Sequence, residues 1–280
     1  MPELPEVETV RRGLAEHIIG KKFKDIEVRH HRATSPKSIA ALTSLKGARV
    51  KEVSRRGKFL WLKLDRPEVL AGHLGMSGQL LIQPKSAADE RHLRVRIDLG
   101  KYELRFIDQR TFGWLSVEES KGGFPTCVQK IAPDPFDAEF DLVETISRFA
   151  KKKTEIKRAL LDQGVMSGVG NIYADEALWR SKIHPETRTE NMKNTKIQDL
   201  IESATSVMSE ALKVGGTSFD ELYVNVNGES GYFERSLSVY GQEGEGCLRC
   251  GAQIRRITFA NRSSHFCPKC QPTPRAKRNH

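Results

Sequence analysis

The sequence has no long hydrophobic run, few aromatic residues and only five cysteines among its 280 residues. No apolar stretch approaches the roughly 20 residues that a membrane-spanning helix needs, and no apolar signal segment follows the N-terminus. We therefore expect a cytoplasmic protein without a membrane span. In that compartment five cysteines argue against a disulfide framework, and four of them cluster near the C-terminus.

Acidic residues are scarce relative to basic ones. The chain has 46 lysines and arginines against 36 aspartates and glutamates, a net charge of +10 and an isoelectric point near 9.4. This excess indicates a polyanionic partner, above all nucleic acid, although basic ribosomal and membrane-surface proteins share it. The length is sufficient for two modest domains, each with its own core.

The first eight residues, MPELPEVE, combine two prolines with three acids. If Met1 is removed, Pro2 becomes a secondary amine with a pKa of roughly 7.7–8, which is a competent nucleophile for an aldehyde carbon. Glu3 beside it can donate or accept the proton. The plainer interpretation is that Pro5 opens a helix and the acids complement its dipole.

Hydrophobic periodicity divides the chain into a β-rich part and a helical part. Apolar residues at helical spacing predict a first helix over about 5–19, ended by Gly20. The period then becomes two. The clearest strands are 58–64 and 92–99, and others are expected around 22–31, 48–54, 68–74, 79–83, 103–107 and 113–117. We expect a sandwich of antiparallel sheets.

A proline-rich, acidic break over 131–137 marks a domain boundary. Beyond it, helical spacing predicts helices around 142–149, 156–161, 172–180 and 200–212, the last ended by Gly215-Gly216. The final residues, 275–280, have the composition of a disordered basic tail.

The clustered cysteines form two knuckles, Cys247/Cys250 and Cys267/Cys270, with the spacing of a four-thiolate zinc site. Four cysteines leave no open coordination position, so we expect one structural zinc ion. The segment between the knuckles has strand character and carries Arg255, Arg256 and Arg262, as a hairpin that presents arginine would. The alternative is a zinc ribbon that serves folding only.

A lysine-rich segment, 151–157, leads into a helix, and a glycine-rich turn, 164–171, separates that helix from the next. A helix, a glycine turn and a second helix can offer backbone N–H groups to phosphate, and the lysines would make such binding salt-dependent. A solvated basic face is the alternative.

Three short motifs place unusual side chains on turns. Lys58 follows a glycine ahead of a buried strand, and Met76 lies in a glycine-bounded loop. Arg110 and Phe112 are two residues apart, which puts them on one face if the segment is extended. These side chains could fill the gap left by an extruded base, whereas the alternative places Met76 and Phe112 in the core.

The cysteine knuckles occur together with the motifs PELPEVE, RRGKFL, HLGMSG, DQRTFG, KKKTEIK, GVGNIYADE and GYFERSLSVYG. On these motifs, the sequence from Pro2 to Cys270 resembles the formamidopyrimidine-DNA glycosylase family of bacterial repair enzymes. The resemblance implies an α+β fold, with a β-sandwich domain that begins with a helix and a helical helix-two-turn-helix domain that ends in a zinc-finger hairpin. It implies domains over 1–132, 133–240 and 241–272 and a tail over 273–280, with damaged double-stranded DNA bound in the cleft by a monomer.

The resemblance also implies a role for each site residue. Pro2 would be the Schiff-base nucleophile, Glu3 would transfer protons, and Lys58 would assist β-elimination. Arg262 would contact phosphate and take part in δ-elimination. The implied DNA-binding positions are His92, Arg110, Lys152, Lys157 and Asn171, the implied wedge is Met76, Arg110 and Phe112, and the implied zinc ligands are Cys247, Cys250, Cys267 and Cys270.

The leading hypothesis is therefore excision of oxidised purines, such as 8-oxoguanine and formamidopyrimidines, followed by strand cleavage at the abasic site. An endonuclease VIII-type enzyme, with the same chemistry on oxidised pyrimidines, is the nearest alternative, and the continuation after Pro2-Glu3 favours the purine enzyme. A non-catalytic zinc protein that binds damaged DNA would leave Pro2, Glu3 and Lys58 without a shared purpose. The segment 216–223, where the family folds a loop over the extruded base, departs from the family pattern, so no base contacts are assigned there.

Overall fold

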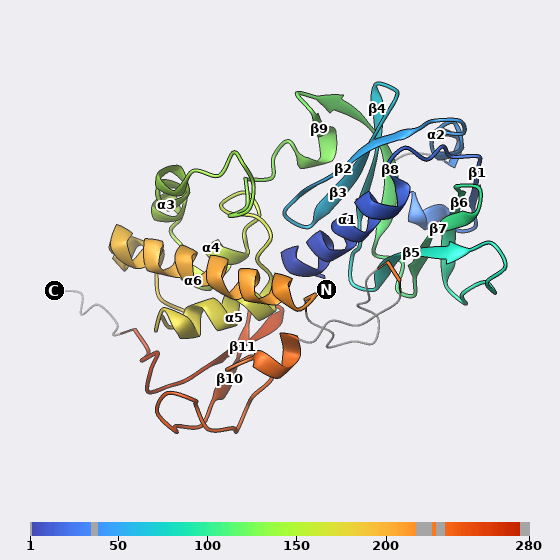
Figure 1. Ribbon diagram of the computed structural model, residues 1–280. Helices are drawn as coiled ribbons and strands as arrows, with labels where there is room; N and C mark the ends of the chain where they lie inside the picture. Colours follow the sequence, from blue (N-terminus) through green and yellow to red (C-terminus); the bar gives the residue numbers. More distant parts are fainter. Residues whose placement is uncertain (1, 35–38, 217–225, 228–232, 275–280) are drawn as a thin grey trace. The chain divides into compact units, whose positions relative to one another are not determined.

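The computed structural model describes residues 2–34, 39–216, 226–227 and 233–274 (Figure 1). It contains two compact units, Met1–Ile131 with Ala211–Phe233 and Ala132–Glu210 with Glu234–His280. The residues expected to cover an extruded base, 217–223, and the basic tail over 275–280 lie outside the described part of the chain. Within that part, no helix is both long enough and apolar enough to cross a membrane.

The first unit is a sandwich of two antiparallel sheets. One sheet has the order β1-β6-β7-β5 and the other β2-β3-β4-β8-β9. The elements are α1 (Leu4–Ile18), β1 (Asp25–Val28), α2 (Ile39–Thr43), β2 (Val50–Arg56), β3 (Phe59–Leu64), β4 (Glu68–His73), β5 (Gly78–Pro84), β6 (Leu93–Asp98), β7 (Tyr102–Asp108), β8 (Trp114–Lys121) and β9 (Phe124–Pro125), with short 3₁₀ turns at His31–Ala33 and Thr126–Val128.

The first helix confirms the helix expected at the N-terminus. Val7, Val10, Leu14 and Ile18 recur at helical spacing and are all buried in the sandwich core, where α1 packs against β2, β3 and β5. Gly20 stops it with a φ of 80°, a conformation that costs glycine nothing. Figure 1 shows α1 lying along the strands of the sandwich.

The second unit is helical and ends in a hairpin. Its elements are α3 (Leu142–Lys151), α4 (Ile156–Leu161), α5 (Asn171–Arg180) and most of α6 (Asn194–Lys213), 3₁₀ turns at Thr189–Asn191 and Phe233–Ser236, and the strands β10 (Arg255–Phe259) and β11 (Arg262–Phe266). Asp141 caps α3 by accepting the Glu144 N–H at 2.8 Å. The α+β class, with a β-sandwich, a helical unit and a cysteine-flanked hairpin, is thus confirmed.

Candidate active site and DNA-binding surfaces

Pro2 and Glu3 immediately precede the first turn of α1. Pro2 is buried, and Glu3 is the N-cap residue with only 2% of its surface exposed. Glu3 and Glu6 form a reciprocal capping box, in which the Glu3 N–H donates to Oε2 of Glu6 at 2.8 Å. The helix dipole favours a carboxylate at this position, so the fold holds Glu3 rigidly beside Pro2.

Lys58 occupies the turn between β2 and β3. Arg56 pairs with Phe59, so Gly57 and Lys58 are the two loop residues, and the φ of 55° at Gly57 suits a type II′ turn. Lys58 as a whole is only 6% exposed. A tight hairpin in a buried sheet therefore fixes the direction of this lysine.

His73, at the end of β4, is a candidate site residue that the sequence motifs did not single out. It lies opposite Phe59 in the β3–β4 register, one residue from Lys58. Burial, followed by the charge of Lys58, lowers the pKa of His73 to about 4. The Gly75 N–H donates to its Nδ1 at 3.1 Å, so the neutral ring carries its proton on Nε2. The available signal was a histidine that ends a run of buried apolar residues at the start of HLGMSG.

The three residues expected to form a wedge are exposed in two neighbouring loops. Met76 is 37% exposed and Phe112 56%, so the core alternative is wrong for both. The Arg110 guanidinium lies 5.2 Å above the Phe112 ring. These two residues do share one side of the chain, but not through an extended segment, because Thr111 has a φ of 55° and the chain bends there. His92, half-buried ahead of β6, accepts the Asp108 N–H through its carbonyl oxygen at 3.0 Å.

The lysine-rich segment of the second unit contains two different kinds of lysine. Lys152 follows α3 with 44% of its side chain exposed and pairs with Asp162 at 2.7 Å. Lys157, in α4, is completely buried, and its Nζ lies 2.6 Å from Oδ1 of Asp175. The burial and the ion pair of Lys157 argue against the DNA contact expected of it, which stays a prediction that binding measurements test.

Lys157 instead helps to hold the start of β11. Its Nζ donates to the Ser263 carbonyl oxygen at 3.0 Å, and Asn171 Nδ2 donates to the same oxygen at 3.1 Å. Asp175 accepts from the Ser264 hydroxyl and the His265 N–H, both at 2.8 Å. Arg262, the residue before Ser263, is exposed at the tip of the hairpin. The network therefore anchors the strand that presents Arg262.

The four clustered cysteines have the geometry of a metal site. Their Sγ atoms all lie within 4.8 Å of one another, with Cys247–Cys270 at 4.0 Å and Cys250–Cys267 at 3.4 Å. A tetrahedron of thiolates about 2.3 Å from zinc has edges of about 3.8 Å, so the arrangement fits the ion. Burial and the three neighbouring thiols raise the pKa of Cys270 to about 12, so full ionisation of the set needs a cation.

Trp179 connects the end of α5 to the cysteine cluster. Its indole Nε1 donates to Sγ of Cys247 at 3.4 Å. Arg249, from the first knuckle, lies with its guanidinium 4.0 Å above the Trp179 ring and donates to the Trp179 carbonyl oxygen. A donor to a ligand sulfur and a stacked cation tie the zinc site to the helical unit.

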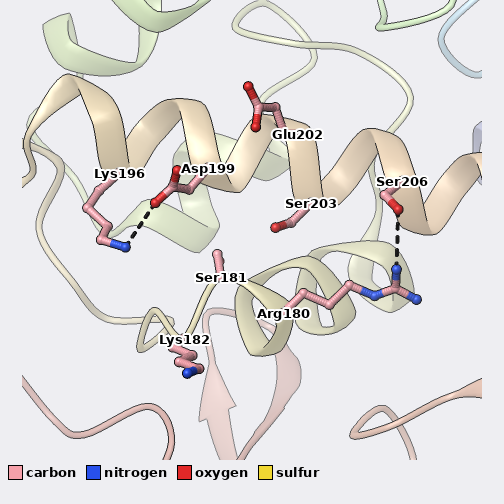
Figure 2. Close-up of a pocket in the computed structure, with 8 residues that line it drawn as sticks. All are labelled: Arg180, Ser181, Lys182, Lys196, Asp199, Glu202, Ser203 and Ser206. Carbon is pink, nitrogen blue, oxygen red and sulfur yellow. Dashed lines mark hydrogen bonds and ion pairs between the residues drawn. The ribbon is translucent and has the colours of Figure 1, made fainter.

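An open groove of about 490 Å³ lies between α5 and α6 (Figure 2). Its lining consists of Arg180, Ser181, Lys182, Lys196, Asp199, Glu202, Ser203 and Ser206. Arg180 pairs with Glu210 at 2.5 Å and Lys196 with Asp199 at 2.9 Å. Because these charges already compensate one another, we assign the groove no function.

A β-sandwich followed by a helix-two-turn-helix unit and a zinc finger defines a class of base-excision DNA glycosylases. The N-terminal domain of formamidopyrimidine-DNA glycosylase matches residues 1–115, its helix-two-turn-helix domain matches residues 131–222, and the zinc finger found in that enzyme and in isoleucyl-tRNA synthetase matches residues 244–273. The chain belongs to the formamidopyrimidine-DNA glycosylase family.

Individual relatives agree over nearly the whole chain. The formamidopyrimidine-DNA glycosylase of a Nocardioides species is 54% identical over 99% of this chain and 97% of its own. Two solved structures of the Lactococcus lactis enzyme have TM-scores of 0.88 over 97% of this chain and 100% of theirs. One is a point mutant, 35% identical, bound to DNA containing Fapy-dG, and the other is the wild type, 36% identical, bound to DNA containing an oxidised pyrimidine.

Proposed function

We propose that the protein is a bifunctional DNA glycosylase that excises oxidised purines, 8-oxoguanine and formamidopyrimidines among them, and then cleaves the strand at the abasic site. The observation that carries the proposal is the burial of Pro2 and Glu3 together at the first turn of α1. A free N-terminal proline there would be a secondary amine beside a fixed carboxylate. That pair is suited to attack on an aldehyde-level carbon and to the accompanying proton transfer.

In the proposed first step, the Pro2 nitrogen bonds to C1′ of the damaged nucleotide and the glycosidic bond breaks. The base leaves with the bonding electron pair and takes up a proton. Loss of the amine proton and opening of the sugar ring leave a cationic iminium between Pro2 and C1′, with Glu3 transferring the protons. The iminium acidifies the C2′ proton, and removal of that proton expels the 3′ phosphate by β-elimination.

Lys58 and Arg262 would assist the strand cleavage. Lys58 is buried and aimed by a tight turn, which suits a group that acts in β-elimination. Arg262, exposed beside the anchored Ser263, would contact a backbone phosphate and promote δ-elimination. Neutral His73, which keeps a proton on Nε2 next to Lys58, would add a hydrogen-bond donor to the same site.

The partner would be double-stranded DNA containing oxidised bases or abasic sites. His92, Arg110, Lys152 and Asn171 are the remaining DNA-binding residues, and Met76, Arg110 and Phe112 would fill the space left by the extruded nucleotide. We propose domains over 1–132, 133–240 and 241–272 with a tail over 273–280, and a monomer that acts on the bacterial nucleoid in the cytoplasm.

Excision of oxidised pyrimidines, the endonuclease VIII-type activity, is the second candidate, and one observation favours keeping it. A wild-type relative has been captured with DNA containing an oxidised pyrimidine, whereas a mutant of the same relative was captured with Fapy-dG. Rates of excision from matched duplexes with 8-oxoguanine or thymine glycol distinguish the two. Faster release of thymine glycol would contradict the purine assignment.

Borohydride trapping tests the proposed nucleophile. Reduction during reaction with 8-oxoguanine or abasic DNA should give a stable protein–DNA adduct that peptide mapping places on the Pro2 nitrogen. Intact mass spectrometry first establishes that Met1 is removed, because a retained Met1 makes that nitrogen an amide. Acetylation of the N-terminus, or an uncleavable tag, should abolish trapping while DNA binding persists. Full activity of a tagged N-terminus, or an adduct on Lys58, would refute Pro2.

A further inference from the structure

Arg55 joins the helix that begins at Pro2 and Glu3 to the turn that carries Lys58. Its Nε donates to Oε2 of Glu8 on α1 at 3.0 Å. Its Nη1 donates to the Gly57 carbonyl oxygen, also at 3.0 Å. The Gly57 carbonyl belongs to the peptide bond that leads into Lys58, so one guanidinium bonds both to α1 and to the lysine turn.

The bridge is buried and fully charged. The side chain of Arg55 is 6% exposed and that of Glu8 11%. Burial alone would raise the pKa of Glu8, but hydrogen bonds from Arg11, Arg55 and Arg12 lower it to about 2. Glu8 is therefore an anion at every pH at which a repair enzyme works. The planar guanidinium reaches two acceptors in fixed directions, which an ammonium group cannot reproduce.

We infer that Arg55 is a positioning residue, which sets Lys58 relative to Pro2 and Glu3 by bonding to Glu8 and to the Gly57 carbonyl. The inference rests on the proposed function. Pro2 and Glu3 lie at the start of α1, whereas Lys58 lies in the β2–β3 turn. Effective proton transfer requires the distance between these two parts of the site to be kept within a fraction of an ångström. Arg55 acts through the turn and not on the reacting atoms.

Arg12 supplies a matched control. Its Nε donates to Oε1 of Glu8 at 2.8 Å, a shorter contact than that of Arg55, but its side chain is 56% exposed and this ion pair stays within α1. Arg12→Gln and Arg55→Gln each remove one arginine from the same carboxylate. Only Arg55→Gln also releases the Gly57 carbonyl.

The test measures single-turnover rates of 8-oxoguanine excision and of cleavage at a preformed abasic site, with saturating enzyme, together with the affinity for DNA containing a tetrahydrofuran abasic analogue. Arg55→Gln should slow cleavage at the abasic site, the step assigned to Lys58, about 10- to 100-fold, slow base excision less, and leave the affinity within about twofold of wild type. Arg12→Gln should leave the rates within about twofold. Arg55→Lys keeps the positive charge but not both hydrogen bonds, so its rate of cleavage at the abasic site should lie between those of Arg55→Gln and wild type.

Folding is separated from positioning by thermal unfolding of each variant. Glu8 keeps Arg11 and Arg12 when Arg55 is replaced, so Arg55→Gln should remain folded at the assay temperature. Wild-type rates in folded Arg55→Gln, or an equal loss in Arg12→Gln, would overturn the inference alone. A wild-type enzyme that forms no borohydride adduct would instead refute the proposed function.

Discussion

Ser77 donates a hydrogen bond from Oγ to Oδ1 of Asp108 at 2.5 Å, and both side chains are buried. The Arg110 N–H donates to the Ser77 oxygen at 3.0 Å, and the Gly113 N–H donates to Oδ2 of Asp108 at 2.7 Å. Gly75, in the loop of Met76, lies so close to the loop of Arg110 and Phe112 that a Cβ added to Gly75 would be 2.4 Å from the Gly113 nitrogen. One carboxylate thus joins the loop of Met76 to the loop of Arg110 and Phe112.

The Arg110 N–H also donates to Oδ1 of Asp108, at 3.1 Å. Asp108→Ala should destabilise the first unit because it removes the buried acceptor of two backbone N–H groups, those of Arg110 and Gly113, and of the Ser77 hydroxyl. Each such loss costs roughly 1–3 kcal/mol, so we expect a decrease of about 3 kcal/mol in the free energy of unfolding by urea. Asp65→Ala is the control, because Asp65 is exposed and accepts one N–H, from Arg49, at 2.8 Å. Equal stability losses in the two variants would contradict the role of the Asp108 carboxylate.

His73 predicts a pH dependence of stability. Its pKa in the folded protein is about 4, against 6.5 for an ordinary histidine. The unfolded chain therefore binds this proton first as pH falls. Neutral His73 therefore contributes to the free energy of unfolding in full above pH 6.5. This contribution, at most roughly 3 kcal/mol, is lost as pH falls from 6.5 to about 4.

The measurement compares urea unfolding of wild type and His73→Gln at several pH values from 7 to 4.5. The wild type should lose more stability than the variant over this range, and other histidines cancel in the comparison. Direct titration of the His73 ring by NMR should show no more than about one-tenth protonation at pH 5. A midpoint near 6.5 would show that the ring is not shielded as described.

The sequence motifs predicted the sandwich, the first helix and the zinc site because each is encoded locally, by alternation, helical spacing or paired cysteines. The bend at Thr111 could not be predicted, since the bonds that hold the flanking N–H groups, Arg110 to Ser77 and Gly113 to Asp108, depend on the tertiary structure. The first strand was expected over 22–31 and is shorter in the structure, because its length is set by hydrogen bonds to residues distant in the sequence. Phe23 donates its N–H to the Ala48 carbonyl, away from the partner strand of β1, which is limited to Asp25–Val28.

Lys157 shows the limit of reading charge from sequence. Three lysines precede it, and a run of basic residues predicts a solvated or DNA-binding face. Its partners, Asp175 and the Ser263 carbonyl, come from a different helix and from the hairpin, so only the tertiary structure reveals its burial. His73 was missed for the same reason, because its proximity to Lys58 depends on strand register.

Zinc removal should unfold the finger while the sandwich persists. Structural zinc contributes roughly 10–16 kcal/mol in small fingers, more than a loop of this length can replace. Chelation or Cys247→Ser should therefore abolish tight DNA binding but retain the β-sheet signal in circular dichroism. Trp179 fluorescence should change on chelation, because its indole bonds to Cys247. Tight binding by fully metal-free protein would contradict this expectation.

Arg262→Ala should weaken binding to damaged DNA of any sequence to a similar extent, since a phosphate contact carries no base information. The slope of log affinity against log salt should decrease by about one charge. Binding isotherms at several salt concentrations measure it, with Arg255→Ala, at the far end of β10, as the exposed control. An unchanged slope for Arg262→Ala would place Arg262 away from the backbone.

The contrast between Lys152 and Lys157 gives the last prediction. Lys152→Ala removes an exposed charge and should lower the salt slope by about one with little change in stability. Lys157→Met leaves Asp175 buried without its cation and should cost roughly 3–5 kcal/mol, with an unchanged salt slope in the folded protein. Asp175→Asn tests the same pair with a smaller loss, because an amide can still accept from Ser264. Calorimetry measures the loss of stability and salt-dependent binding measures the loss of phosphate contacts, so together they decide whether each lysine stabilises the fold or binds DNA. A Lys157→Met protein of wild-type stability with a reduced slope would restore the DNA contact that the buried ion pair argues against.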